Sequence, residues 1–166
     1  MADKAQRFRH NAFVRGELHA FLSHDHERLD GLLKKAIGGD FEAYQEFRRG
    51  LLWHIGVEEK ILFPIVRTAT GDSDLLRQLH RDHAALGALL MPPPNAADLE
   101  QIRMILEAHN PLEERPGGLY ETIDDSALER VRAFPPVPVA PHADSEITRA
   151  SIEQLLRQRS SRAVDR

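Results

Sequence analysis

Nine histidines and the complete absence of cysteine define the chemistry open to this 166-residue chain. Without cysteine there are no disulfides, thiolate nucleophiles, zinc fingers or cysteine-ligated iron–sulfur clusters. Any metal bound by the chain must therefore be held by nitrogen and oxygen atoms. Four histidines and two glutamates recur at helical spacing and are the candidate ligands: His26, His54, His83, His109, Glu58 and Glu113.

These six residues interrupt apolar stripes. Four segments carry apolar residues at alternating spacings of three and four, which is typical of helices packed nearly antiparallel. Each stripe has one histidine at an apolar position, as at His26 between Leu22 and Leu29, and two stripes have a glutamate one turn later. Burial of an ionised carboxylate costs several kcal/mol of free energy unless the group is paired or bound to metal. The pattern therefore predicts a shared cation in the core.

The same ligand pattern occurs twice in the chain. The motif D-H-x-x-L-x-x-L-L spans 25–33 and 82–90, and H-x-x-x-E-E followed by leucine and an aromatic residue occurs in 54–63 and 109–120. The chain thus contains two copies of one helical hairpin, each with a histidine on its first helix and a histidine and a glutamate on its second. A repeated ligand set predicts a pair of metal ions.

Six nitrogen and oxygen ligands also favour two ions over one. They exceed the needs of a single tetrahedral site, whereas two metals about 3.5–4 Å apart can each take two imidazoles and share both carboxylates. Histidine and glutamate four residues apart lie about 6 Å apart along one helix face, so both reach the same centre. Imidazole with carboxylate suits iron, and zinc or manganese would also fit this ligand type.

Turn residues divide the chain into four long helices and a tail. The expected helices run from about Val14 to Ile37, from a cap at Asp40 to about Arg67, from about Asp74 to Met91, and from a cap at Asn95 or Asp98 to about Glu114. Glycine or proline clusters separate them. Short connections predict an all-α, up-and-down antiparallel four-helix bundle in residues 1–134. Residues 135–166 are expected to form a Pro-rich linker and a short amphipathic tail helix over about Ser145 to Arg159.

At this point the sequence resembles the hemerythrin-like, or HHE cation-binding, domains. The resemblance covers roughly Leu18 to Asp124 and depends on DHERL, HIGVEEKILFP, DHAAL and HNPLEERPGGLY in that order. It implies that the six candidate residues ligate a non-haem di-iron centre, with Glu58 and Glu113 as bridges. It also implies one of the family's activities: reversible O₂ binding, sensing of O₂ or redox state, an iron response, or protection from nitric oxide with repair of iron centres.

The ligand set stays open at two positions. His80, three residues before His83, is a further candidate ligand about 60° round the helix. Pro111 lacks a backbone N–H and predicts a kink before Glu113, which makes Glu114 an alternative to Glu113. Otherwise Glu59 and Glu114 are expected either to be solvated or to hold a ligand imidazole. Tyr120 is a candidate to face the site.

Charge and composition narrow the partners. The net charge of -4 and the pI near 6.1 provide no general basic field for nucleic acid or anionic lipid. No membrane-length apolar run or signal-peptide core occurs, so a cytoplasmic location is expected. We expect a binding or sensing module for O₂ or nitric oxide rather than an enzyme. The alternatives are a di-iron enzyme for nitric oxide or peroxide reduction or iron-cluster repair, and a structural zinc-binding bundle. The oligomeric state is open.

Overall fold

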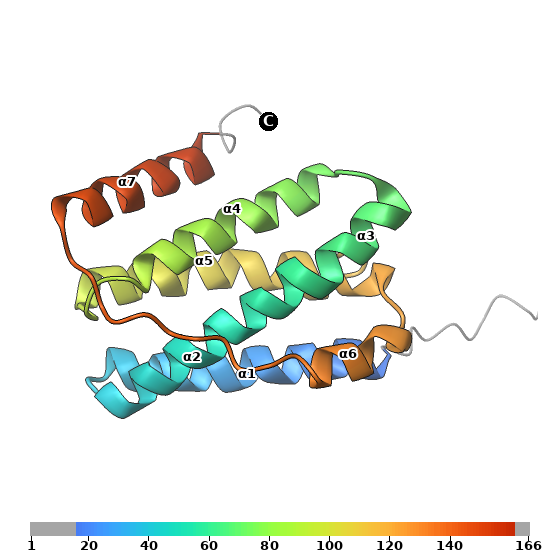
Figure 1. Ribbon diagram of the computed structural model, residues 1–166, viewed down its shortest axis with the longest axis horizontal. Coiled ribbons are helices and arrows are strands. Elements are labelled where there is room, and N and C mark those ends of the chain that lie inside the picture. The colour runs from blue at the N-terminus through green and yellow to red at the C-terminus, as the bar shows by residue number, and fades with distance from the viewer. Residues whose placement is uncertain (1–15, 162–166) are drawn as a thin grey trace, which may run out of the picture.

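The computed structural model describes residues 16–161, and every regular element in this range is a helix or a helical turn (Figure 1). The all-helical expectation is confirmed for this part of the chain. The elements are α1 (Glu17–Ile37), α2 (Phe41–Val57), the π-helical turn η1 (Glu58–Leu62), α3 (Phe63–Thr70), α4 (Asp74–Leu89), α5 (Ala96–Glu114), the 3₁₀ turns η2 (Tyr120–Thr122) and η3 (Asp125–Ala127), α6 (Leu128–Arg132) and α7 (Glu146–Ser160). None of these helices is long and apolar enough to cross a membrane.

Polar side chains begin three of the long helices. Asp40 accepts a hydrogen bond from the Ala43 backbone N–H at 2.9 Å, and Asn95 does the same for Asp98 at 2.9 Å. The predicted cap at Asp40 is confirmed, and Asn95 rather than Asp98 caps α5. Val14, the predicted start of the first helix, lies outside the described residues.

The second long helix departs from its expected continuous form at the candidate ligand Glu58. The Phe63 N–H bonds to the Glu58 carbonyl five residues earlier, which is the π-helical spacing. Pro64, in the first turn of α3, has no N–H to continue the ordinary ladder, and the chain widens just before it. The helical path then continues to Thr70 and not only to about Arg67.

Pro111 lies inside α5 and does not end it. The helix continues to Glu114, and the Arg115 N–H bonds to the Pro111 carbonyl at 3.1 Å. Because a proline loses only the bond that its own N–H would make, the following turn can still form. Glu113 therefore keeps its place on the buried face of the helix.

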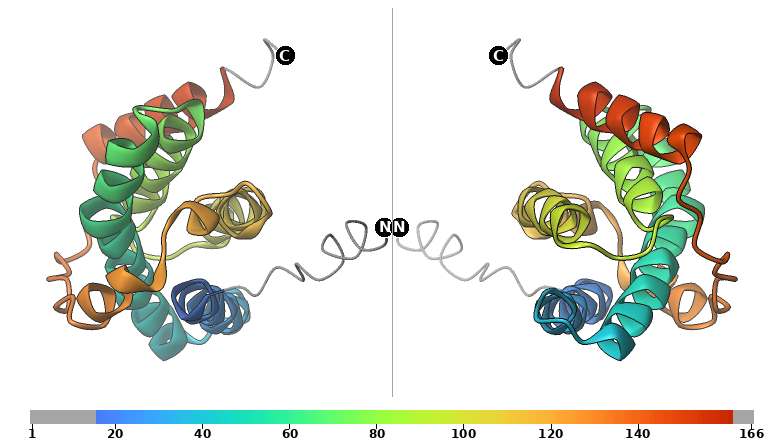
Figure 2. Two further views of the ribbon diagram at one scale, coloured as in Figure 1. Left: turned by 90° about the vertical axis from the view of Figure 1, so that its right-hand side faces the viewer. Right: turned by 90° about the vertical axis from the view of Figure 1, so that its left-hand side faces the viewer.

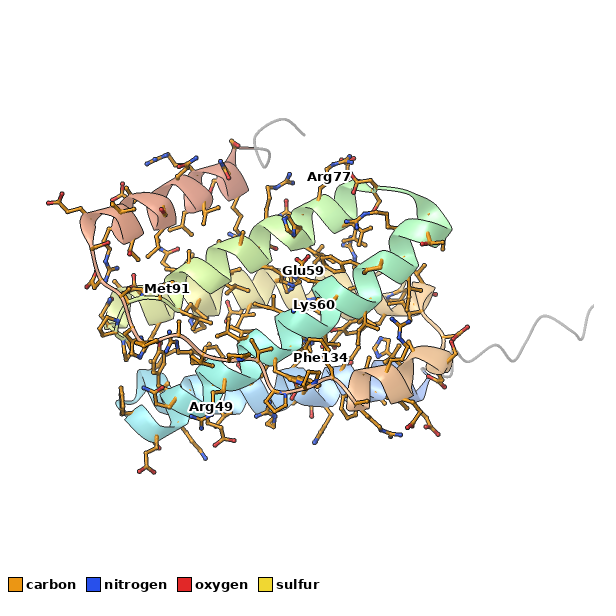
Figure 3. The ribbon with its side chains drawn as sticks, viewed as in Figure 1. Arg49, Glu59, Lys60, Arg77, Met91 and Phe134 are labelled. Atoms are coloured by element: carbon orange, nitrogen blue, oxygen red, sulfur yellow. The ribbon has the colours of Figure 1, made fainter. Side chains whose placement is uncertain are left out.

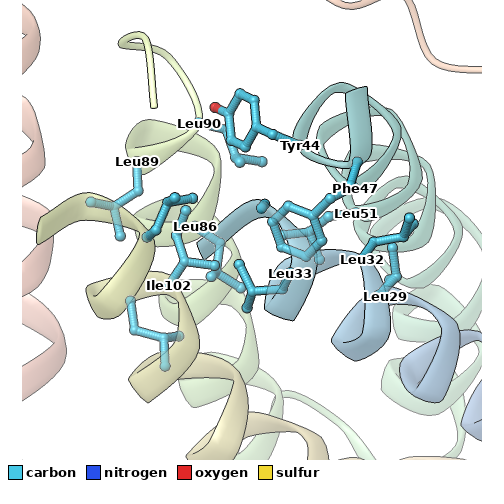
Figure 4. Packing of buried hydrophobic residues seen from close by; sticks show 14 of the residues in the cluster. Leu29, Leu32, Leu33, Tyr44, Phe47, Leu51, Leu86, Leu89, Leu90 and Ile102 are labelled. Carbon is cyan, nitrogen blue, oxygen red and sulfur yellow. The ribbon is translucent and has the colours of Figure 1, made fainter. Parts of the chain in front are cut away.

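The long helices lie side by side around a common interior, as the two views along the long axis show (Figure 2). Helix α1 packs against α2 and α5, and α4 packs against α5 and α7. Their buried side chains form two apolar clusters. One contains Leu29, Leu33, Phe47 and Leu86 (Figure 4), and the other surrounds Phe63 and Tyr120.

The chain after α6 returns across the outside of α2 before forming α7 (Figure 1). Trp53 donates its indole N–H to the Phe134 carbonyl at 3.1 Å, and Lys60 lies 5.8 Å from the Phe134 ring centroid (Figure 3). Helix α7 then lies against α4 of its own chain, with Ile152 buried in the apolar cluster of Leu29. The tail thus packs on α2 and α4 of its own chain.

Candidate metal centre

The six candidate ligands form a polar layer between the two apolar clusters. Along α1, His26 lies between Leu22, which belongs to one cluster, and Leu29, which belongs to the other. The other three histidines likewise lie on α2, α4 and α5 at the boundary between the two apolar clusters. The helical spacing therefore delivers all six residues to one depth of the core, enclosed on both sides by hydrocarbon.

The structure brings the six residues together as two overlapping groups. One potential metal-binding group contains His26, His54, Glu58 and Glu113, and the other contains Glu58, His83, His109 and Glu113. Within each group, one nitrogen or oxygen atom from every residue lies within 4.8 Å of the others. Both carboxylates belong to both groups, so the arrangement offers two neighbouring cation positions with shared glutamates.

Burial of this polar layer would be less costly with a bound cation. Glu58 and Glu113 have no exposed surface, and none of the four histidines is more than 7% exposed. Glu58 Oε2, Glu113 Oε1 and His83 Nε2 are buried without a well-oriented hydrogen bond, and their close neighbours are other ligand candidates: His83 Nε2 lies 3.1 Å from Glu58 Oε2, and His109 Nε2 lies 2.9 Å from Glu113 Oε1. Unpaired buried acceptors cost free energy, and a metal ion would satisfy them directly. The donor set, of imidazole nitrogen and carboxylate oxygen, fits iron, zinc or manganese.

A carboxylate orients each imidazole of the first group. His26 Nδ1 lies 2.5 Å from Glu114 Oε1, and His54 Nδ1 lies 2.8 Å from Asp25 Oδ2. An Nδ1–H that donates to a carboxylate leaves the Nε2 lone pair free to face the interior. The Nε2 atoms of these two histidines are 3.0 Å apart. Both rings thus present their metal-binding nitrogen to one point.

The second group is built in the same way. His83 Nδ1 lies 2.7 Å from Glu59 Oε1, and His109 Nδ1 lies 3.1 Å from Asp82 Oδ2. On the interior side, His109 Nε2 lies 2.9 Å from Glu113 Oε1. All four imidazoles therefore have a fixed orientation and a basic nitrogen directed inward.

The internal repeat explains these partners. The aspartate of each D-H pair, Asp25 or Asp82, orients the histidine on the second helix of its own hairpin. The second glutamate of each H-x-x-x-E-E motif, Glu59 or Glu114, orients the histidine on the first helix of the other hairpin. The expectation that Glu59 and Glu114 hold an imidazole is confirmed. The two aspartates were not predicted as partners, although their repetition in the D-H motif was the available signal.

Tyr120 enters the first group from η2. Its hydroxyl donates to Glu58 Oε1 at 2.6 Å and lies 3.2 Å from Nε2 of both His26 and His54. Gly118 makes this return possible, because a Cβ there would lie only 2.6 Å from the Glu113 carbonyl oxygen. Burial and the two nearby glutamates raise the pKa of Tyr120 well above its ordinary value, so the hydroxyl keeps its proton.

The second group has no hydroxyl at the corresponding place. In the internal repeat Phe63 corresponds to Tyr120, since each follows a leucine after the H-x-x-x-E-E motif. The Phe63 ring stacks on His83 with centroids 5.3 Å apart, and the Tyr120 ring stacks on His26 at 5.8 Å. At this position the two halves of the centre therefore differ by one polar atom.

Protons carry the positive charge of this layer in the absence of metal. Burial lowers the pKa of His54, but the charge of Glu58 and the hydrogen bond to Asp25 outweigh it and raise the pKa to about 10. Burial likewise opposes protonation of His109, whereas Glu113 and Asp82 raise its pKa to about 10. These pKa values indicate a strongly negative pocket that attracts cations.

His80 and Glu114, the two less certain ligand candidates, lie outside both groups. The His80 side chain is 67% exposed, and its Nδ1 lies 2.9 Å from Glu59 Oε1. Glu114 contacts Nδ1 of His26 and not the interior nitrogen. Glu113, despite the proline two residues before it, is the glutamate that faces the centre.

The helical fold with a buried histidine and glutamate layer is that of a cation-binding domain. Residues 17–116 match the family model described as Hemerythrin HHE cation binding domain. The chain belongs to this family, as its motifs indicated. No curated protein and no solved structure matches the chain. Tyr120 and α7 lie beyond the matched residues.

Proposed function

We propose that this protein holds two iron ions in its core and binds or senses O₂ or nitric oxide there. The observation that carries the proposal is the membership of Glu58 and Glu113 in both ligand groups. On this assignment His26 and His54 would hold one ion, His83 and His109 would hold the other, and both ions would share the two glutamates. The helix order and short connections support an up-and-down antiparallel four-helix bundle over residues 1–134, with residues 135–166 as linker and tail helix.

Charge balance supports two divalent ions. Six carboxylates surround the four imidazoles: the two shared glutamates and the four groups that orient the rings. Two divalent ions supply four positive charges, and Arg28 and Arg159, which pair with Asp25 and Asp82, supply the other two. Neutral imidazoles then complete a site without net charge, which lowers the cost of its burial.

The chain's own residues would protect and orient such a centre. The carboxylates fix each imidazole, and Leu22, Leu51, Leu79 and Leu86 exclude water above and below the layer. Iron, when bound, supplies redox chemistry and coordination of small ligands. No protein nucleophile is needed for binding, which favours a binding or sensing module over an enzyme.

The second candidate is an enzyme that uses the same centre to reduce nitric oxide or peroxide, or to repair iron clusters. The Tyr120 hydroxyl favours it, since a protonated phenol 2.6 Å from Glu58 is a proton donor beside the metal positions. Stoichiometric binding and turnover with a reductant are therefore the two behaviours to separate.

Metal content and optical spectra test the proposal. Protein from iron-replete cells should contain about two iron ions per chain, and the reduced protein should take up one O₂ or nitric oxide per pair, with a spectral change that reverses when the gas is removed. Catalytic consumption of gas or peroxide with added reductant would favour the enzyme. Tightly held zinc with only trace iron would overturn the di-iron assignment in favour of a structural bundle.

A further inference from the structure

A cavity of about 230 Å³ extends from the ligand layer toward the surface. Its inner end is lined by the four histidines and Glu58, and its outer end by Asp30 of α1 and by Arg103 and Glu107 of α5. The cavity therefore connects the candidate metal centre to solvent between α1 and α5. It is also far larger than a diatomic gas requires.

The walls between these ends are apolar. They include leucines from α1, α2, α4 and α5: Leu29, Leu33, Leu51, Leu86 and Leu106. Figure 4 labels the first four of these. A cavity of about 150 Å³ lined by such side chains stays dry and binds benzene. The present cavity is larger, so its size and lining suit a molecule with an apolar body at least as large as one aromatic ring.

The charges at the outer end already have partners. Asp30 Oδ2 accepts from Lys34 Nζ at 2.6 Å, and Arg103 pairs with Glu100 at 2.6 Å and with Glu107. These groups thus neutralise one another along their own helices. An ionic ligand would have to break such pairs, whereas a neutral ligand can pass without doing so.

Apart from the ligand candidates at its inner end, the described lining of the cavity has one buried side-chain polar atom without a hydrogen bond. Asn110 lines the cavity, and its Oδ1 is buried without a hydrogen bond. A buried carbonyl oxygen left unpaired costs free energy, and a ligand that donates one hydrogen bond recovers part of this cost. The wall therefore favours a ligand with one O–H or N–H group.

We propose that this cavity is a binding site for a neutral small organic molecule with a single-ring-sized apolar body and one hydrogen-bond donor. The ligand binds beside the metal centre, with its apolar part against Leu33 and Leu106 and its donor on Asn110. The proposal depends on the cavity and not on the identity of the metal. It extends the proposed function because the centre then acts next to an organic ligand as well as a gas.

Phenol and benzene are the probes. The full-length protein is loaded with zinc and its metal content is measured. Each probe is then titrated into it, and binding is followed by calorimetry and NMR. We expect one phenol per chain with a Kd at or below about 1 mM, and benzene bound about 2–10-fold more weakly, since it lacks the donor. Replacing zinc by cobalt should broaden the bound phenol resonances, because the ligand lies beside the metal.

Two kinds of variant locate the ligand. Leu106→Trp fills the cavity and should abolish phenol binding, whereas Met104→Trp, on the exposed side of the same helix, should leave it unchanged. Leu33→Phe fills the opposite wall and serves if the first variant does not fold, as judged by its helical circular dichroism. Asn110→Ala should reduce phenol affinity to that of benzene without changing benzene affinity.

The result that overturns the proposal is the absence of saturable binding in folded protein, or binding that neither filling variant affects. The same titration on metal-free protein separates this outcome from a failure of the proposed function. If metal analysis finds no iron but phenol still binds in the cavity, the di-iron assignment fails and the cavity site stands. If two iron ions are found and phenol does not bind, the reverse holds.

Discussion

Arg159 Nε lies 2.5 Å from Asp82 Oδ1, so the last turn of α7 contacts the support of the candidate metal centre. Asp82 is only 1% exposed, and its other oxygen accepts the Nδ1–H of His109 at 3.1 Å. Helix α7 lies outside the residues that match the family model. A segment beyond the family domain thus takes part in holding a ligand imidazole.

In the first hairpin, the corresponding aspartate is paired with an arginine of its own helix. Arg28 Nε donates to Asp25 Oδ1 at 2.8 Å, three residues away on α1. The position three residues after Asp82 is Ala85, a buried small residue packed in the core. The second hairpin therefore has no arginine of its own at that place, and α7 supplies one.

Arg159→Ala should weaken metal binding by the second ligand group. Without the guanidinium, Asp82 is left as a buried carboxylate with fewer partners, and its hold on His109 loosens. We expect the affinity for one of two zinc ions to fall about tenfold, measured by competition with a chelator. Arg159→Lys should retain part of the affinity because the charge remains.

Arg157→Ala is the matched control, since Arg157 is on the same turn but is 71% exposed and pairs with Glu153 of its own helix. Its zinc affinities should equal those of the unaltered protein. Equal zinc affinities in Arg159→Ala would show that α7 packs on α4 without supporting the centre.

The metal contents of His109→Ala and His80→Ala should distinguish a metal ligand from a histidine that does not bind metal. His109 is 3% exposed and faces Glu113, so its removal should reduce iron or zinc content from about two ions per chain to about one or fewer. His80 is exposed and contacts only Glu59 among the groups of the centre, so His80→Ala should retain about two. Metal analysis by mass spectrometry measures both, and full occupancy in His109→Ala would refute the ligand set.

Spacing along the helices was sufficient to predict which residues meet. The stripes fixed the level of each histidine, and because the long helices pack side by side, equal levels become one layer. The internal repeat then predicted two equivalent halves. Both features depend on helical period alone, which a sequence displays directly.

The details of contacts that depend on tertiary packing could not be predicted from the sequence. The π-helical turn at Glu58 needs the precise path of the chain before Pro64, and the link from Arg159 to Asp82 joins residues 77 positions apart across a proline-rich segment. Tyr120 was a sequence candidate to face the site, but its hydrogen bonds there depend on the tight turn after α5 that Gly117, with φ of 78°, and Gly118 allow. No helical period encodes such contacts.

Tyr120→Phe should destabilise the metal-free protein. The hydroxyl donates to the buried Glu58 carboxylate at 2.6 Å, and a hydrogen bond to a charged group contributes about 1.5–3 kcal/mol. We expect the free energy of unfolding to fall by about 2 kcal/mol in urea denaturation. The cobalt-loaded variant should keep two ions per chain but show an altered absorption spectrum, since the ligand environment on the His26 side has changed.

Tyr44→Phe is the control for Tyr120→Phe. Tyr44 is also buried but belongs to the apolar cluster of Leu29, away from both ligand groups. Removal of the Tyr44 hydroxyl should leave the absorption spectrum of the cobalt-loaded protein unchanged. A spectrum in Tyr120→Phe identical to that of the unaltered protein would show that the hydroxyl does not influence the centre.

The raised pKa values of His54 and His109 predict how stability depends on pH in the metal-free protein. Both pKa values rise from 6.5 to about 10 on folding, so the protonated rings bind their carboxylates more strongly in the native state. This stabilisation is fully present below about pH 6.5 and is lost as the pH rises toward 10. Denaturant unfolding should therefore give a lower free energy of unfolding at pH 9.5 than at pH 7.

Metal binding should release these protons. A metal ion takes the neutral imidazole, so at pH 8, where His54 and His109 are protonated in the metal-free protein, zinc must displace about one proton from each. We expect about two or more protons per chain in weak buffer, followed with a pH indicator. The apparent zinc affinity should rise with pH for the same reason. Zinc binding at pH 8 without proton release would mean that these two histidines are neutral before the metal arrives, and that the negative pocket is balanced in another way.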